Sequence, residues 1–255
     1  MIHQTAIIDK SAVIGKDVEI GPYAVIGENV SIGDGTVVFS HAVVEYAEIG
    51  KNCKIFSHSA VGTAPQDLKY AGEKTKVIIG DGTVIREYAT VNRGTVAHGQ
   101  TVVGKNCLLM TSSHIAHDCI VGNNVIIANC CAAAGHVEIE DNVVIGGLAA
   151  VHQFTRIGRN AMIGGGAMVT MDVIPYAQAQ GDRARLAGLN LVGLKRRQMP
   201  IEDIENIKHA YRVLFMSKLP LEQALLKLEE LKDCAPVNEI ITFIKKSQRG
   251  ICRHR

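Results

Sequence analysis

Four histidines stand close enough in the sequence to form a site that could move a proton or bind a metal. They are His114, His117, His136 and His152, out of ten histidines in the 255-residue chain. Imidazole titrates near neutral pH, so a histidine can act as a general base, and its neutral form is a common metal ligand. Because a lone histidine is more often a hydrogen-bonded structural residue, a site requires a fold that brings these four together.

A six-residue repeat shows how the fold could do so. From Val103 to Val169 every sixth residue is apolar, and a similar run extends from Ile2 to Ile32. Glycine often follows the aliphatic residue, as at Gly15. Six residues at about 3.3 Å each form a flat face of roughly 20 Å, and the glycine permits the corner that follows. The sequence therefore predicts an all-β solenoid of hexapeptide repeats.

This pattern resembles the left-handed parallel β-helix of hexapeptide-repeat acyltransferases, in which three hexads close one triangular coil of eighteen residues. On that geometry His117 lies beside Gly135 and next to His136, with His152 near the same edge one coil farther on. Two chemistries compete. Three imidazoles could hold a catalytic zinc, as in the carbonic anhydrases that share the solenoid. Alternatively, one histidine is a general base and the others bind or orient substrate.

The second chemistry is favoured for two reasons. No cysteine or carboxylate joins the histidines in a recurring metal-ligand spacing, and a backbone N–H at Gly135 could face the reacting atom. We therefore expect acyl transfer, with no metal and no cofactor required.

Interruptions of the six-residue repeat indicate where loops and a second domain lie. Residues 62–76 and 92–101 break the six-residue step, and such insertions in solenoids form loops on one face, often the binding face. The hexads stop after Tyr176, and three segments with helical spacing follow, each with a proline near its start: Pro200, Pro220 and Pro236. We expect a β-helix domain over 1–189 and an α-helical domain over 190–255 that caps one end of the solenoid.

Composition excludes several classes of protein. The chain is 47% hydrophobic and 20% charged with a net charge of +2, which argues against disorder and against nucleic-acid binding. The seven cysteines are odd in number and form no C-x-x-C pair, and the start MIHQTAIIDK lacks the pattern of a secretory signal. No stretch approaches 18 uninterrupted apolar residues, so no membrane insertion is expected. These features predict a cytoplasmic protein.

Three motifs carry a more specific resemblance. QDLKYAGE (66–73), HIAHDC (114–119) and GLKRR (193–197) are together similar to the UDP-N-acetylglucosamine O-acyltransferases that start lipid A synthesis. The similarity covers the whole chain. It implies that the sugar 3-hydroxyl attacks the thioester of an (R)-3-hydroxyacyl acyl carrier protein. It also implies a homotrimer, because the clefts of this family lie between parallel solenoids, and a long aliphatic face needs cover.

The resemblance assigns roles to individual residues. His117 matches the general base of the family, and the amide of Gly135 would hold the tetrahedral oxyanion. Asp118 could orient His117, although adjacent residues on a strand point in opposite directions. Matches near the sugar and phosphate, along the cleft or toward the nucleotide are Asp67, Lys69, His114, His136, His152, Gln153, Asn190, Arg196 and Arg197.

Ordinary explanations exist for some of these matches. The basic run 195–197 could be a solvated charge run, although forked guanidinium groups suit a diphosphate. Asp67 and Lys69 could be an exposed loop pair. Two residues depart from the family pattern: Val192 stands where an acidic residue is frequent, and Asn92 stands where some members carry histidine.

Gly165 matches the position that acts as a ruler for the far end of the acyl chain, where glycine leaves room and methionine blocks it. The sequence therefore predicts a preference for a myristoyl-type over a decanoyl-type 3-hydroxyacyl donor. A zinc-dependent lyase and a non-catalytic scaffold remain the alternatives to the acyltransferase, but a scaffold would not account for the QDLKY loop.

Overall fold

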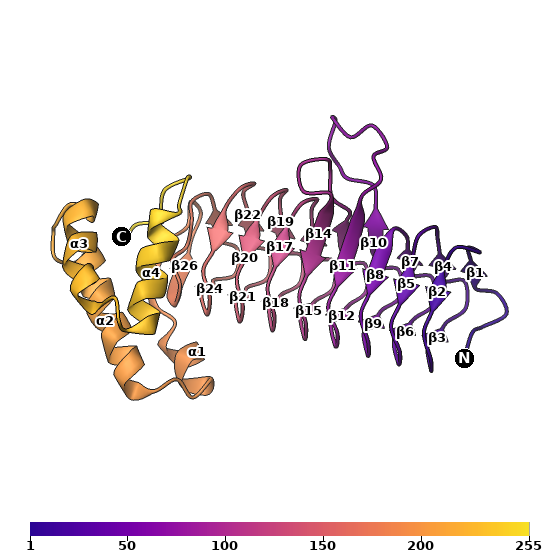
Figure 1. Ribbon diagram of the computed structural model, residues 1–255, viewed down its shortest axis with the longest axis horizontal. Coiled ribbons are helices and arrows are strands. Elements are labelled where there is room, and N and C mark those ends of the chain that lie inside the picture. The colour runs from indigo at the N-terminus through magenta and orange to yellow at the C-terminus, as the bar shows by residue number, and fades with distance from the viewer. Residues whose placement is uncertain (255) are drawn as a thin grey trace.

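The computed structural model describes residues 1–254 and places most of them in a long three-sided coil (Figure 1). Its 27 strands, most of them two residues long, stack in three sheets whose paired strands are parallel except at the C-terminal end. Partners in neighbouring coils, such as Ala132 and Ala150, are eighteen residues apart. The predicted solenoid of three hexads per coil is therefore confirmed.

The first sheet contains β1 (Ile7–Ile8), β4 (Val25–Ile26), β7 (Val43–Val44), β10 (Ala60–Thr63), β13 (Thr90–Asn92), β16 (His114–Ile115), β19 (Ala132–Ala133), β22 (Ala150–Val151) and β25 (Met168–Val169). The second contains β2 (Val13–Ile14), β5 (Ser31–Ile32), β8 (Ala47–Ile49), β11 (Lys76–Ile79), β14 (Gln100–Val103), β17 (Ile120–Val121), β20 (Glu138–Ile139) and β23 (Arg156–Ile157). The third contains β3 (Glu19–Ile20), β6 (Val37–Val38), β9 (Lys54–Ile55), β12 (Val84–Ile85), β15 (Leu108–Leu109), β18 (Ile126–Ile127), β21 (Val144–Ile145), β24 (Met162–Ile163), β26 (Ala177–Gln180) and β27 (Arg185–Leu189).

The core is a stack of aliphatic layers inside the coil. The largest fully buried side chains are isoleucines, joined only by Leu109, and each comes from the inward position of a short strand. Isoleucine suits this position because its branched Cβ favours extended backbone and packs well on a sheet. Burying each such side chain contributes about 1.5–3 kcal/mol. The many equivalent layers explain why a regular repeat suffices to specify the fold.

At the corners of the coil, the glycine that follows the aliphatic residue has a different role from the predicted one. The left-handed backbone conformation falls not on the glycine after the aliphatic residue but two positions later, as at Asp17 with φ 53°. Gly15 is required instead for close approach of the next coil, since a Cβ there would lie 2.7 Å from Oδ1 of Asp34 and 2.9 Å from its backbone nitrogen. Such contacts leave no room for a side chain.

Four α-helices and one 3-10 helix follow the solenoid: α1 (Leu191–Arg196), α2 (Ile201–Phe215), α3 (Leu221–Leu228), η1 (Glu229–Leu231) and α4 (Ala235–Lys245). Pro200 and Pro220 occupy the N-caps of α2 and α3, and Pro236 lies in the first turn of α4, as predicted. The helices lie at the C-terminal end of the solenoid (Figure 1). No helix within residues 1–254 is long and apolar enough to span a membrane.

Two features of this end were not predicted from the sequence. One is the short helix α1, and the other is the return of the chain to the solenoid, where Ile251 forms a bridge with Asp172 and His254 one with Leu186. The division into domains at 189/190 falls between β27 and α1, and as a domain boundary it stays a prediction.

Candidate active site

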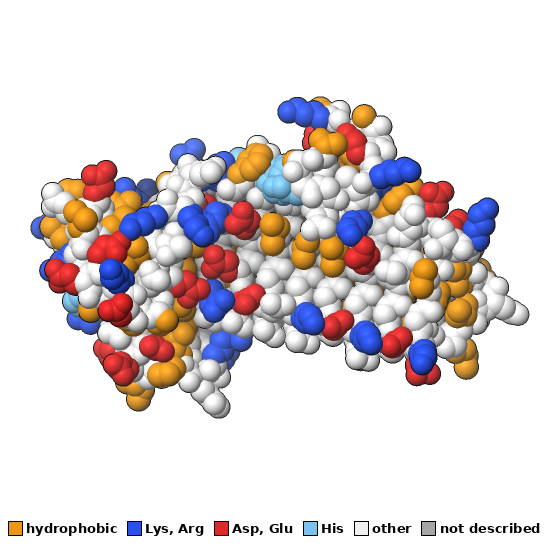
Figure 2. Space-filling view, in the orientation of Figure 1, with side chains coloured by type: hydrophobic (Ala, Val, Ile, Leu, Met, Phe, Trp, Pro, Cys, Tyr) orange, Lys and Arg blue, Asp and Glu red, His pale blue; other side chains and the backbone are white. Residues whose placement is uncertain are grey.

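One edge of the solenoid carries most of the polar residues singled out in the sequence. We call it the histidine edge: it consists of the segments that connect first-sheet strands to second-sheet strands, residues 64–75, 93–99, 116–119, 134–137 and 152–155. The first two segments are the insertions, and they stand out from the coil side by side (Figure 1). Histidine side chains gather on this edge next to the base of the insertions (Figure 2).

His117 and Asp118 form a hydrogen-bonded pair on this edge. His117 Nδ1 lies 2.8 Å from Oδ2 of Asp118, whose carboxylate is fully buried. The alternation of side chains along a strand does not apply here, because Asp118 sits at a corner with φ 59°. The left-handed turn brings its side chain back beside that of the preceding residue. The pairing that the sequence argument treated as unfavourable is therefore present.

The Asp118 carboxylate accepts four hydrogen bonds. Oδ1 accepts from the backbone N–H groups of Thr95, at 2.9 Å, and His98, at 3.3 Å, and Oδ2 accepts from Thr95 Oγ1, at 2.6 Å, and His117. Burial opposes ionisation, but the hydrogen bonds from Thr95 and His117 outweigh it and hold the pKa of Asp118 below its ordinary value. An ionised carboxylate can only accept. His117 Nδ1 must therefore be the donor, which leaves the lone pair on Nε2.

The same geometry bears on metal binding. His117, Asp118 and His136 offer ligand atoms within 4.8 Å of one another, so a carboxylate does join the histidines, contrary to expectation. However, a carboxylate has about four acceptor positions, and those of Asp118 are all in use. A metal could bind there only by displacing His117 or the 93–99 loop. The donor set fits an oriented base better than a metal centre.

Gly135 contacts the ring of His117 as predicted by the eighteen-residue step. A Cβ at Gly135 would lie 2.6 Å from Cε1 and 2.7 Å from Nε2 of His117, so only glycine fits. Its carbonyl accepts a hydrogen bond from the backbone N–H of Phe154. No group within residues 1–254 accepts from the Gly135 N–H, which leaves that donor free beside the imidazole.

A second group of rings surrounds the pair. His136 packs edge-on against His117 at 5.1 Å and against His98 at 5.5 Å between ring centroids, and it stacks on Phe154 at 4.5 Å. Burial lowers the pKa of His136, which favours its neutral form. A cleft of about 390 Å³ opens beside His98, His136 and Phe154. His98 was missed in the sequence because it lies in an insertion that breaks the repeat.

The other predicted histidines and Gln153 lie on this edge or on the strand that leads into it. His114 projects from β16, with Nδ1 2.7 Å from Thr90 Oγ1, and burial lowers its pKa. His152 and Gln153 are exposed at the next corner, where His152 Nδ1 lies 3.1 Å from the carbonyl of Gln153. His152 lies on the predicted edge, but the ring that stacks on His136 belongs to Phe154.

The longer insertion carries Asp67 and Lys69. Asp67 Oδ1 accepts from the backbone N–H of Lys69 at 3.0 Å, which closes a tight turn. The negative charge of Asp67 acts on His136, where it opposes the lowering of the pKa by burial. The insertion thus brings an acidic side chain, with a lysine two residues later, to the mouth of the histidine cluster.

Asn190, Arg196 and Arg197 lie on a different edge of the same chain. Asn190 caps α1 by accepting from the N–H of Gly193 at 3.1 Å, and its Nδ2 donates to the carbonyl of Asn160 at 2.9 Å. Arg197 donates to Oδ1 of Asn142 at 2.7 Å. Asn142 and Asn160 connect the second sheet to the third, so this edge is separated from His117 by a sheet face. One chain does not bring these residues to the histidines.

Gly165 lies on the third edge, between β24 and β25. A Cβ there would meet only the carbonyl oxygen of Gly147, at 3.3 Å. Its φ is not in the left-handed region, so a side chain is allowed by the backbone. No other heavy atom lies within 4 Å of that Cβ position.

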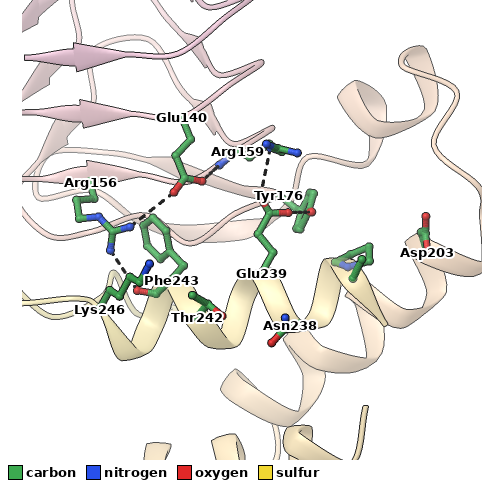
Figure 3. A pocket seen from close by; sticks show the side chains of 12 residues that line it. Glu140, Arg156, Arg159, Tyr176, Asp203, Asn238, Glu239, Thr242, Phe243 and Lys246 are labelled. Carbon is green, nitrogen blue, oxygen red and sulfur yellow. Dashed lines mark hydrogen bonds and ion pairs between the residues drawn. The ribbon is translucent and has the colours of Figure 1, made fainter. Parts of the chain in front are cut away.

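A larger crevice, of about 490 Å³, lies between the solenoid and α4 (Figure 3). Several of its polar side chains are paired with one another: Arg159 lies 3.2 Å from Glu239, Tyr176 donates to Glu239, and Arg156 lies 3.6 Å from Glu140. Burial raises the pKa values of Glu140 and Tyr176. This network fastens α4 to the solenoid and contains none of the predicted site residues.

Family models match both parts of the chain. "Bacterial transferase hexapeptide (six repeats)" matches residues 100–132 and 136–170, and "Udp N-acetylglucosamine O-acyltransferase; Domain 2" matches residues 172–252. The first model corresponds to the solenoid, and the second to its C-terminal end and the helices.

Curated relatives and solved structures match over nearly the whole length. Acyl-[acyl-carrier-protein]–UDP-N-acetylglucosamine O-acyltransferases from Thermodesulfovibrio yellowstonii and Myxococcus xanthus are 51% and 50% identical, each covering 99% of both chains. The structure of LpxA from Acinetobacter baumannii matches with a TM-score of 0.95 at 42% identity, covering 99% of both chains. UDP-N-acetylglucosamine acyltransferase from Campylobacter jejuni matches with 0.96 at 38% identity, covering 100% of both chains. The fold is a left-handed parallel β-helix with a C-terminal helical part.

Proposed function

The chain belongs to the acyl-[acyl-carrier-protein]–UDP-N-acetylglucosamine O-acyltransferase family, and from this premise we propose how it performs the first step of lipid A synthesis. It is an acyltransferase. The donor is an (R)-3-hydroxyacyl acyl carrier protein, and the acceptor is the 3-hydroxyl of UDP-N-acetylglucosamine. His117 is the general base and the amide of Gly135 holds the oxyanion.

Proton transfer starts the reaction. The Asp118 carboxylate fixes the His117 ring through Nδ1, so Nε2 presents its lone pair to the sugar 3-hydroxyl and removes the proton as the C–O bond forms. Because His117 and Asp118 make an ion pair once the imidazole is protonated, the charge that develops on the ring is stabilised by a buried partner.

Acyl transfer then proceeds through a tetrahedral intermediate. The sugar oxygen bonds to the thioester carbon, and the carbonyl oxygen takes the negative charge beside the free N–H of Gly135. One such donor typically lowers the barrier by about 3–4 kcal/mol. When the intermediate collapses, the C–S bond breaks and His117 returns the proton to the carrier sulfur, which leaves the O-acylated sugar nucleotide.

The substrate-binding roles follow from placement. Asp67, whose charge acts on His136, stands on the longer insertion with Lys69 two residues later. His136, His152 and Gln153 lie on the histidine edge, and His114 projects from the adjoining strand β16. Asn190, Arg196 and Arg197 reach the nucleotide only if a neighbouring copy supplies them, because they lie on another edge of their own chain. This separation supports the homotrimer, in which the cleft lies between solenoids. Light scattering is expected to show a trimer, and a stable active monomer would contradict it.

The observation that carries the proposal is the contact of the His117 ring with a glycine whose N–H is unpaired, one coil along the edge. The test is an acyl-transfer assay with UDP-N-acetylglucosamine and a set of acyl carrier protein thioesters. We expect a product acylated at the 3-hydroxyl and the highest rate with a 3-hydroxyacyl donor. Failure to acylate the sugar nucleotide with any donor would overturn the proposal.

A further inference from the structure

The two insertions on the histidine edge are joined by one buried arginine. Arg93 begins the shorter insertion, and its side chain is only 11% exposed. Its Nε and Nη2 donate to the hydroxyl of Tyr70, in the longer insertion, at 3.0 and 2.8 Å. Its third nitrogen, Nη1, donates to the carbonyl of Gly62 at 2.8 Å and lies 3.3 Å from Glu45. The guanidinium therefore connects the two insertions and β10, the strand that leads into the longer insertion.

Aromatic rings also restrict the position of the Arg93 guanidinium. The guanidinium carbon lies 4.4 Å from the ring centroid of Tyr46 and 5.4 Å from that of Tyr70, both within the range of a cation–π contact. Tyr70 donates its own proton to the carbonyl of Glu73 at 2.9 Å. The hydroxyl is thus both donor and double acceptor, and it ties the end of the longer insertion to Arg93.

Each insertion holds a different part of the site. On the longer one, Tyr70 follows directly after the turn formed by Asp67 and Lys69, and its N–H donates to the carbonyl of Asp67 at 3.0 Å. On the shorter one, Thr95 lies two residues after Arg93 and donates twice to Asp118. The Arg93–Tyr70 contact therefore joins the longer insertion, which carries Asp67 and Lys69, to the shorter insertion, which holds Asp118 beside His117.

We propose that Arg93 is a positioning residue that sets Asp67 and Lys69 in register with His117 by clasping Tyr70, so that the bound sugar nucleotide presents its hydroxyl to the base. The inference rests on the proposed function of the histidine edge. The clasp acts on binding of the sugar nucleotide and leaves proton transfer at His117 to Asp118 and Thr95.

Tyr70→Phe is the sharpest test, because it removes only the oxygen to which Arg93 donates and keeps the ring. Two donors of a buried guanidinium lose their partner, and we expect the KM for UDP-N-acetylglucosamine to rise about tenfold. The kcat and the KM for the acyl donor are expected to stay unchanged. Calorimetry with UDP-N-acetylglucosamine alone should show the same loss of affinity without any turnover.

Matched variants distinguish the loss of the Arg93–Tyr70 contact from a nonspecific effect of substitution. Tyr88→Phe removes a hydroxyl from an exposed ring on another edge and should leave both KM values unchanged. Thr95→Val removes the side-chain hydrogen bond to Asp118 and should lower kcat while the sugar-nucleotide KM holds. Arg93→Lys keeps the charge but replaces the three nitrogens that donate to Tyr70 and Gly62 with a single one, and it should reproduce the KM effect of Tyr70→Phe if it folds.

The outcomes distinguish the positioning role of Arg93 from the proposed acyltransferase function. If Tyr70→Phe keeps the wild-type affinity for the sugar nucleotide, or lowers kcat with KM unchanged, the clasp is wrong. If the wild-type chain does not acylate UDP-N-acetylglucosamine, or His117→Ala stays active, the proposed function fails independently of Tyr70.

Discussion

Gly165→Met tests whether the acyl chain ends at the third edge of the solenoid. Strands of neighbouring coils lie about 4.8 Å apart, so Gly165, between two and three coils beyond His117, lies about 13 Å farther along the axis. The first sheet separates their two edges, and its outer positions there include Ala132 and Ala150. These small side chains leave room for an extended chain across the face.

The size of the expected effect follows from the difference in length between the two acyl chains. Each buried methylene contributes about 0.8 kcal/mol, so the four extra carbons of a myristoyl-type chain gain about 3 kcal/mol over a decanoyl-type chain. That energy corresponds to about a hundredfold preference in kcat/KM. A methionine at 165 has only the Gly147 carbonyl oxygen within 4 Å of its Cβ, and its longer side chain should occupy the volume that the end of the longer acyl chain would take. The preference should therefore reverse while the fold is kept.

The assay measures kcat/KM for both 3-hydroxyacyl donors with wild type, Gly165→Met and Gly165→Ala. Gly165→Ala is the matched control, because it adds the same Cβ without the long side chain and should leave the donor ratio near the wild-type value. An unchanged ratio in Gly165→Met, with its thermal unfolding midpoint preserved, would remove Gly165 from the ruler role.

The other predictions concern the buried pair and the metal. Asp118→Asn loses a charge-assisted hydrogen bond to His117 and should lower kcat by about 10- to 100-fold with substrate KM values little changed; unchanged kcat would refute its role in orienting the base. Because hydrogen bonds hold the folded pKa of Asp118 below its ordinary value, the pair stabilises the fold above that ordinary value and loses this contribution as pH falls through the folded pKa. Urea unfolding across the acid range should therefore show a smaller pH dependence in Asp118→Asn than in wild type, and equal slopes would count against the pKa assignment. Treatment with a chelator should leave turnover unchanged; loss of activity that zinc restores would favour the carbonic-anhydrase-like chemistry instead.

Most of the fold was accessible from the sequence because every coil repeats one pattern. The six-residue step predicted the inward isoleucines, and the prolines predicted α2, α3 and α4. The helix α1 was missed because six residues are too few for a helical period to show. The return of residues 251–254 depends on tertiary packing, which leaves no local pattern.

The site was predictable where it follows the repeat. The eighteen-residue step placed Gly135 and His136 beside His117, and it also places Phe154, rather than His152, beside His136. The eighteen-residue spacing does not extend through the insertions. His98, the only histidine in the shorter insertion, was therefore missed. Asp118 was named as a possible partner of His117, but the objection raised against it was misplaced, because a rule for strands was applied to a residue that occupies a left-handed corner.

The roles of Arg93 and Tyr70 depend on long-range contacts between two insertions. Their sequence separation is set by loop lengths, which no periodicity constrains. A buried arginine beside an inserted loop was the available signal, but burial is known only once the fold is known.

The central claim, that His117 is the base for acyl transfer to UDP-N-acetylglucosamine, is tested most directly by the turnover of His117→Ala. A general base contributes about two to four orders of magnitude in rate, so the purified, folded variant should lose nearly all activity. His58→Ala, which removes an exposed imidazole from a ring stack on another edge, should retain wild-type turnover. If His117→Ala keeps more than about a tenth of wild-type activity, the loss falls below the range expected of a general base and the claim is contradicted.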